Sequence, residues 1–261
     1  MKHLELRFDG GVATVTLNRP DVRNAFNDEV IAELTAVFSE LGERGEVRCI
    51  VLAANGSAFC AGADLNWMKR MAGYTRDENL ADAAALANML RVIYRCPKPT
   101  IVRVQGDVYA GGTGLVAVCD IAVSVDTAQY CLSEVKLGLI PATVSPYVIR
   151  AMGERAAHRY FLTAERFGAA EALRIGFVHE VVTADVLDAK VAELARSLVQ
   201  AGPVAVKACK ELVQDVGGRN ITQLLIDRTV EGIADIRASD EGREGIQAFL
   251  GKRKPGWLQE S

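Results

Sequence analysis

The sequence predicts an α/β fold followed by a helical C-terminal region. Segments with the periodicity of strands alternate with segments of helical periodicity as far as about residue 187. The connections between them are short, which is typical of an α/β domain. Beyond that point every periodic segment is helical. We therefore expect an α/β core over residues 1–190, and over 191–261 a helical region that packs on the core or on another subunit.

The N-terminal segments begin with a hairpin. The stretch "LELRFDGGVATVTL" (4–17) has two short strand patterns around an Asp-Gly-Gly turn, a strong hairpin signal. Asn27 then precedes apolar residues at helical spacing over 30–41, so we expect it to cap a helix. "VRCIVLAA" (47–54) is continuously apolar, as in a strand that is buried on both faces.

The alternation continues through the middle of the chain. "AFCAGADL" (58–65) is expected to be a loop, 79–95 a helix and 99–105 a strand. A glycine turn and a short helix follow in the 110s, and "DIAVSV" (120–125) is another strand. The helices expected beyond residue 187 cover 189–199, 203–216, 221–236 and 239–249.

Composition narrows the class of protein. The 261 residues carry a net charge of −3, and acidic and basic residues are interspersed, which argues against a nucleic-acid partner. No apolar run is long enough to span a membrane, and the N-terminus lacks the pattern of a signal peptide. The six cysteines form no CxxC pair and the three histidines are scattered. We expect a cytoplasmic protein without disulfides, with no membrane partner and no metal or other cofactor.

Two loops of small residues are candidates for a functional site. Gly111 and Gly112 open a predicted helix, whose first N–H groups have no acceptor within the helix and can be approached closely. The alternative interpretation is that the glycines form a tight turn that lets the helix pack on a strand. The segment does not have the GxGxxG spacing of dinucleotide-binding sites. The loop at 58–65 can supply a second N–H group. Two convergent N–H groups are what an oxyanion hole requires, for example to polarise a thioester carbonyl.

The same segments resemble a known family. "VATVTLNRPDVRNAF", "AFCAGADL", "GDVYAGGTGLVAVCDIAVS", "AQYCLSEVKLGLIP", "LTAERFGAAEALRIGFVHEVV" and "EGREGIQAFLGKRKPGW" occur in the order found in the enoyl-CoA hydratase/isomerase (crotonase) family, over essentially the whole chain. The resemblance implies a spiral of repeated ββα units with a C-terminal helical trimerisation region. It also implies an acyl-CoA thioester as substrate and a homo-oligomer, either a trimer or a dimer of trimers.

The resemblance also implies the residues of the site. The backbone N–H groups of Ala63 and Gly111 correspond to the family's oxyanion hole. The residues expected along the CoA moiety are Arg23, Ala25, Ala61, Ala63, Asp64, Leu65 and Gly111, with Phe249 and Lys252 closing over it, in some members from a neighbouring subunit. Without the resemblance, the basic residues among them would be read as solvated surface charges.

The acid–base residues depart from the family's pattern. A typical hydratase has two glutamates beside a water; one corresponds to Glu134 here, and the other falls on Gly114. Glu134 alone can act as base and then as acid. The alternative interpretation is that Glu134 is an acidic residue at a helix N-terminus, where the helix dipole favours negative charge. Asp107 and Tyr109 lie beside the glycine turn as possible substitutes, whereas Asp120 is expected to be structural.

The acid–base residues alone favour an isomerase, whereas a wider resemblance favours an enoyl-CoA hydratase, which we predict with two alternatives. A single glutamate also suffices for a 3-enoyl to 2-enoyl-CoA isomerase, which moves one proton from C2 to C4. A catalytically silent acyl-CoA-binding protein is the alternative from another class. "CLSEVKLGLIPATVSPYVIRAMGERAAHRYFLTAERF" (131–167) resembles bacterial methylglutaconyl-CoA hydratases, which can also have glycine at position 114. We therefore predict hydration of a branched 2-enoyl-CoA, such as 3-methylglutaconyl-CoA, in leucine or related breakdown.

Overall fold

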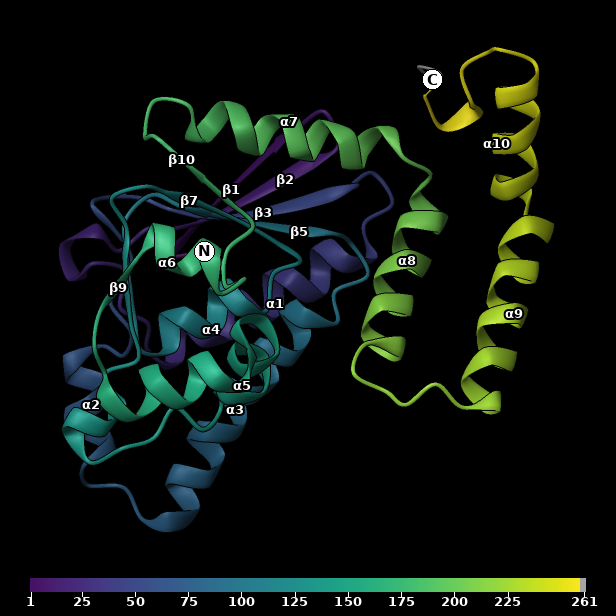
Figure 1. Cartoon of the computed structure of the whole chain (residues 1–261). Coiled ribbons are helices and arrows are strands. Elements are labelled where there is room, and N and C mark those ends of the chain that lie inside the picture. Colours follow the sequence, from purple (N-terminus) through teal and green to yellow (C-terminus); the bar gives the residue numbers. More distant parts are fainter. Residues whose placement is uncertain (259–261) are drawn as a thin grey trace.

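Four successive units of two strands followed by helix build the first two thirds of the chain (Figure 1). The computed structural model describes residues 1–258. The units are β1 (Leu4–Asp9), β2 (Val12–Leu17) and α1 (Asp28–Glu43); β3 (Cys49–Ala54), β4 (Ala58–Cys60), α2 (Leu65–Met71) and α3 (Arg76–Tyr94); β5 (Thr100–Val104), β6 (Asp107–Tyr109) and α4 (Gly111–Ala117); and β7 (Ile121–Val125), β8 (Gln129–Cys131) and α5 (Ser145–Thr163).

The remaining elements complete the sheets and form the helical end of the chain. They are β9 (Phe167–Gly168), α6 (Ala169–Arg174), β10 (Glu180–Val182), α7 (Leu187–Gln200), α8 (Pro203–Val216), α9 (Gln223–Ala238) and α10 (Asp240–Leu250). Short 3-10 helices occur at η1 (Pro20–Val22), η2 (Glu134–Leu137) and η3 (Gly256–Leu258). None of the helices in residues 1–258 is both long and apolar enough to cross a membrane.

The strands form two sheets that grow together along the chain. The larger sheet has the order β1-β2-β3-β5-β7-β10, with β1 antiparallel to β2 and the other pairs parallel. The smaller sheet has the order β4-β6-β8-β9, in which β4, β6 and β8 are parallel. From the second unit on, the first strand of each unit joins the larger sheet and the second joins the smaller one. Each unit therefore advances both sheets by one strand, which produces a spiral.

The long elements that the sequence predicts are present, whereas helix α5, as long as α3, is not among those predicted. The hairpin pairs Leu4 with Leu17, and the Asn27 side chain accepts the N–H of Val30 at the start of α1. All six residues of β3 are buried. By contrast, β4, β6 and β8 fall where the residue patterns predict loops or no element. Each has three residues, which is too short for a periodicity to be visible.

The core lies between the larger sheet and helices α1, α3, α4 and α5, while α7 covers part of the opposite face (Figure 1). Leu187, Val191 and Ala195 of α7 pack on β3, β5 and β7. The boundary predicted near residue 190 lies within this helix, so helices α8–α10 alone extend from the body. Neither α8 nor α9 has a buried residue in the described chain.

Asp120 fastens the helical extension to the body. Its Oδ2 atom accepts the backbone N–H of Thr100 at 2.7 Å and the Thr100 hydroxyl at 2.9 Å. The same oxygen lies 2.8 Å from Nζ of Lys210 on α8, and the Lys210 side chain is 7% exposed. The carboxylate therefore has the structural role that the sequence predicts for it, because it satisfies a buried ammonium group.

We predict that Asp120→Asn lowers the free energy of unfolding by about 2–3 kcal/mol, the range for a lost hydrogen bond to a charged group. Chemical denaturation followed by circular dichroism measures the change. Asp126→Asn, at an exposed position after the other end of β7, is the control and should stay within about 0.5 kcal/mol of the wild type. Equal unfolding midpoints for the two variants would contradict this role.

Candidate active site

Three parallel strands end at one edge of the smaller sheet, and the predicted functional groups follow directly. Ala63 lies three residues after β4, Gly111 two residues after β6 and Glu134 three residues after β8. The ends are in register, because Tyr109 pairs with Cys131 and the N–H of Ala110 donates to the carbonyl of Cys131 at 2.8 Å. The sheet therefore brings all three loops together.

The loop after β4 is held by the segment that precedes α1. Ala63 forms a parallel bridge with Phe26. The N–H of Phe26 donates to the carbonyl of Gly62 at 2.9 Å, and the N–H of Asp64 donates to the carbonyl of Phe26 at 3.0 Å. This pattern uses the groups on either side of Ala63 and leaves its own N–H without an acceptor among residues 1–258.

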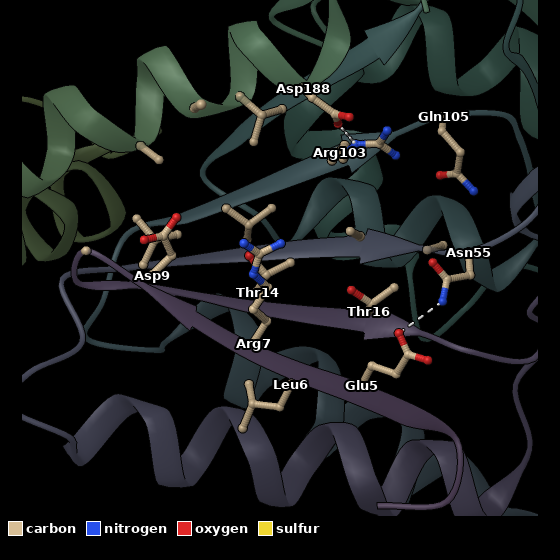
Figure 2. A pocket seen from close by; sticks show the side chains of 18 of the residues that line it. Glu5, Leu6, Arg7, Asp9, Thr14, Thr16, Asn55, Arg103, Gln105 and Asp188 are labelled. Atoms are coloured by element: carbon tan, nitrogen blue, oxygen red, sulfur yellow. Dashed lines mark hydrogen bonds and ion pairs between the residues drawn. The ribbon is translucent and has the colours of Figure 1, made fainter.

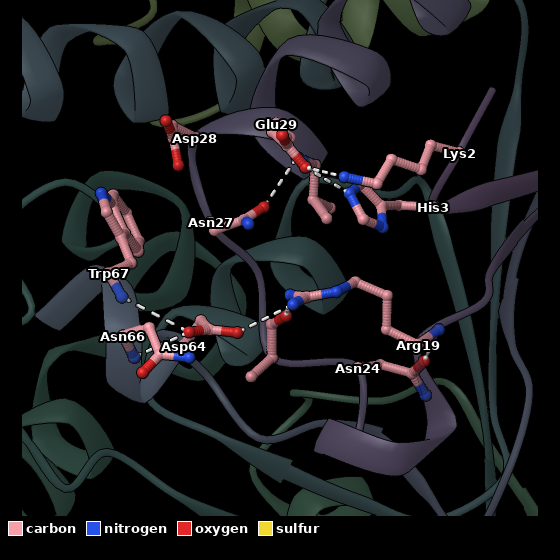
Figure 3. Close-up of polar contacts among 12 residues, drawn as sticks. Lys2, His3, Arg19, Asn24, Asn27, Asp28, Glu29, Asp64, Asn66 and Trp67 are labelled. Carbon is pink, nitrogen blue, oxygen red and sulfur yellow. Dashed lines mark hydrogen bonds and ion pairs between the residues drawn. The ribbon is translucent and has the colours of Figure 1, made fainter.

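Asp64 fixes the start of α2 next to this N–H group (Figure 3). Its carboxylate accepts the N–H groups of Asn66 at 2.8 Å and Trp67 at 3.3 Å, and it pairs with the Arg19 guanidinium at 2.8 Å. Burial opposes ionisation, but Arg19 and the two N–H groups together lower the pKa of Asp64 below its ordinary value. The Asp64 carboxylate is thus engaged within the protein, and it positions the backbone at Ala63.

The loop after β6 is a strained turn into α4. Ala110 has φ +47° and ψ −124°, a conformation that side-chain-bearing residues rarely adopt. The backbone N–H and the hydroxyl of Thr113 both donate to the carbonyl of Ala110, at 2.9 and 2.7 Å. Gly111 is the first residue of α4, and its N–H has no acceptor in the described chain.

Glycine is required at position 111 because the two loops meet there. A Cβ atom on Gly111 would overlap the ring of Phe26. A Cβ atom on Gly62 would lie 3.0 Å from Cβ of Ala110. The interpretation of the glycine turn as a close-packing device is therefore supported, and the use of the Gly111 N–H in an oxyanion hole stays a prediction.

The carboxyl group of Glu134 has one unsatisfied oxygen in the described chain. Its Oε2 atom is buried and has no hydrogen-bond partner among residues 1–258. Burial raises the pKa of Glu134 above the ordinary value for glutamate, and its own backbone N–H only partly opposes this. Buried polar atoms are rarely left unsatisfied in native proteins, so such an atom requires an explanation. A carboxylate with raised proton affinity is suited to take up a proton and return it.

Comparison with known proteins identifies the family. The family model described as enoyl-CoA hydratase/isomerase matches residues 7–260. The chain belongs to the enoyl-CoA hydratase/isomerase family. It is 33% identical to enoyl-CoA hydratase ACTT6 of Alternaria alternata, over 98% of this chain and 84% of the relative.

Solved structures agree with this assignment. An enoyl-CoA hydratase from Shewanella pealeana has a TM-score of 0.95 and 44% identity, over 98% of this chain and 96% of that one. Pseudomonas aeruginosa AtuE has a TM-score of 0.94 and 35% identity, over 98% of this chain and 100% of that one. The predicted resemblance and the predicted crotonase fold are confirmed, and the chain is an enzyme of this family.

In this enzyme, apolar side chains fill the space beside Gly114. A Cβ atom on Gly114 would overlap Cγ1 of Val144. The same Cβ atom would lie 3.0 Å from Cβ of Val144 and 3.4 Å from Cδ2 of Leu90. Val144 and Leu90 are both buried. Oδ1 of Asp107, a possible substitute for the missing carboxylate, accepts the N–H of Gln129 within the smaller sheet.

The residues predicted along CoA lie in two parts of the molecule. The first group surrounds the Ala63 loop: Arg23 is exposed with φ +53°, Ala25 is buried, Ala61 is half-buried and Leu65 is exposed. Phe249 is 82% exposed at the end of α10, and Lys252 follows it. Figure 1 shows α10 far from α2 and α4, so the chain does not bring these two residues to its own Ala63 and Gly111. Their roles toward CoA stay predictions.

Residue patterns missed two residues that shape the site, Phe26 and Val144. Both act by occupying space, and no motif marks such a role.

Among residues 1–258, no group of three or more His, Cys, Asp and Glu side chains is placed to hold a metal ion. A groove of about 1080 Å³ lies between α7 and strands β1, β2 and β3 (Figure 2). It is lined by none of the predicted site residues.

We predict that Gly114→Ala destabilises the wild type by about 1–2 kcal/mol, because overpacking against Val144 outweighs the gain in helix propensity. In a Val144→Gly background the same substitution should instead be neutral or stabilising, by up to about 1 kcal/mol. Denaturant unfolding of the four proteins of this double-mutant cycle measures the coupling.

Gly232→Ala is the matched control, because a Cβ atom there meets nothing within 4 Å in the middle of α9. It should behave alike in both backgrounds. If Gly114→Ala has the same effect with and without the Val144 side chain, that side chain does not fill the space.

Proposed function

We propose that this enzyme is a 2-enoyl-CoA hydratase that uses Glu134 as a single acid–base residue. One observation carries the proposal. Within residues 1–258, the buried and unpartnered Oε2 atom of Glu134 lies at the same sheet edge as the N–H groups of Ala63 and Gly111, which have no acceptor there. An oxyanion hole and a proton-transfer group at one edge are the two elements that hydration of a conjugated thioester requires.

The chemistry follows from these groups. The N–H groups of Ala63 and Gly111 hold the thioester oxygen as it gains negative charge, and one such donor is worth about 10²–10³ in rate. Glu134 takes a proton from a water whose oxygen bonds to C3, and the electron pair of the C2–C3 double bond moves toward the thioester as an enolate. Glu134 then returns the proton to C2. The net change is the addition of one water.

The isomerase remains the second candidate, because Val144 fills the space beside Gly114 and leaves one carboxyl group for the chemistry. In that reaction Glu134 would take a proton from C2 and deliver it to C4. We prefer hydration because residues 131–167 resemble hydratases of branched enoyl-CoAs.

The same resemblance supports 3-methylglutaconyl-CoA as the proposed substrate, and hence the breakdown of leucine or a related compound as the proposed context. A cytoplasmic location and a reaction without metal or redox cofactor stay predictions.

We also propose assembly into a trimer or a dimer of trimers through the helical extension. The large apolar side chains exposed on α9 and α10 are Leu224, Ile226, Val230, Ile233, Ile246, Phe249 and Leu250. A neighbouring subunit that covers them would also bring its Phe249 and Lys252 near another subunit's CoA. Light scattering of the purified enzyme should give three or six times the chain mass, and the mass of a single chain would contradict the proposal.

We predict that Glu134→Gln lowers hydration by a factor of about 10²–10⁴, the usual value of a general acid–base residue. Purified wild type and variant are given crotonyl-CoA, 3-methylglutaconyl-CoA and a 3-enoyl-CoA. Loss of the conjugated absorbance with the mass of one added water reports hydration. Because the base must be ionised, kcat/KM of the wild type should fall with decreasing pH, at a higher pH than for an ordinary glutamate.

The other outcomes discriminate between the candidates. Appearance of the conjugated absorbance from the 3-enoyl-CoA at unchanged mass, without hydration of any 2-enoyl-CoA, would establish the isomerase. Binding of the thioesters without turnover would establish the silent binding protein. Full hydration by Glu134→Gln would show that another group moves the proton.

A further inference from the structure

Arg166 lies at the same sheet edge as the oxyanion loops. Strand β9 runs antiparallel to β8, with Tyr130 paired to Phe167, so Arg166 stands next to the carboxyl end of β8. Its guanidinium carbon lies 5.3 Å from the centre of the Tyr109 ring, a cation–π arrangement. Tyr109 is the last residue of β6 and directly precedes Ala110. The cation is thus held one residue from the strained turn.

The charge of Arg166 is not neutralised within the described chain. Arg166 is exposed and forms no ion pair with any of residues 1–258. The adjacent Glu165 is engaged by Arg159, at 2.6 and 3.0 Å. Asp107, on the same face of β6 as Tyr109, accepts the Gln129 N–H instead.

The Tyr109 phenol lies among charged groups of both signs. Burial raises the pKa of Tyr109, the positive charge of Arg166 opposes this, and the nearby Asp107 carboxylate raises the pKa further. No cation contributes to the raised pKa of Glu134, so Arg166 does not serve as the partner of that carboxylate. A stacked guanidinium keeps its forked N–H donors free, the geometry that recognises carboxylates and phosphates.

We infer that Arg166, held on the Tyr109 ring, binds an anionic group of the CoA thioester. The inference rests on the proposed function, because that function places a thioester between Ala63 and Gly111. Two parts of such a substrate are anionic: the phosphates of CoA, and a carboxylate at the far end of the acyl group, as in 3-methylglutaconyl-CoA. Arg166 is thus a binding residue, and Tyr109 positions it.

The test compares Arg166→Met and Arg166→Lys with the wild type on three thioesters. Crotonyl-CoA has the phosphates alone, 3-methylglutaconyl-CoA has both anions, and crotonyl-pantetheine has neither. If Arg166 binds a phosphate, Arg166→Met raises KM for both CoA thioesters by about 10- to 100-fold and leaves crotonyl-pantetheine unchanged. If it binds the acyl carboxylate, the increase is confined to 3-methylglutaconyl-CoA. Arg166→Lys keeps the charge but loses the fork, so its loss should be smaller.

Arg44→Met is the matched control, because Arg44 is also stacked on an aromatic ring, 4.5 Å from the centre of the Phe8 ring, but pairs with Glu46. Its KM should equal that of the wild type for every thioester. Equal KM values for Arg166→Met and wild type with all three thioesters would overturn the inference.

Direct binding separates this inference from the proposed function. If the wild type turns over none of the thioesters, the proposed function fails, and calorimetric titration of crotonyl-CoA and 3-methylglutaconyl-CoA still tests Arg166. Weaker binding of either thioester to Arg166→Met would support the inference. Equal Kd values for both proteins would overturn it.

Discussion

The contact of Phe26 with two loops is the interaction on which the rest of the site depends. Its backbone pairs with Gly62 and Asp64, and its ring occupies the space where Gly111 would carry a side chain. One residue thereby sets the spacing between the N–H groups of Ala63 and Gly111. The Asp64 cap of α2 and the Thr113 bonds to Ala110 then hold each loop from its own side. Preorganised donors of this kind stabilise a developing charge without reorganisation at the moment of reaction.

The single carboxyl group follows from packing on the other side of α4. Val144 and Leu90 close the space beside Gly114, so a second carboxylate at that position is sterically incompatible with this core. In the remaining carboxyl group, Glu134, one buried oxygen has no hydrogen-bond partner among residues 1–258, and only the residue's own backbone N–H favours the ionised form. Burial raises the pKa of Glu134. A carboxyl group with a raised pKa is suited to act first as base and then as acid.

The sequence predicts much of the fold because its long elements are periodic. The hairpin, the cap at Asn27 and the buried strand β3 all lie where residue patterns place them. The three-residue strands β4, β6 and β8 show no periodicity, yet they align the functional loops. Residue patterns mark Gly111 and the loop at 58–65 as candidates, whereas the particular choice of Ala63 and Glu134 comes from family resemblance. Contacts such as that of Val144 with Gly114 join residues distant in the chain, and a single sequence does not reveal them.

A crystal structure of the enzyme with acetoacetyl-CoA tests the central claim most directly. The account predicts that the thioester oxygen lies about 2.7–3.1 Å from the backbone nitrogens of both Ala63 and Gly111. It also predicts that Glu134 supplies the single carboxyl group facing C2 and C3. A thioester oxygen bound away from either nitrogen, or a second carboxyl group within hydrogen-bond distance of those carbons' substituents, would contradict it.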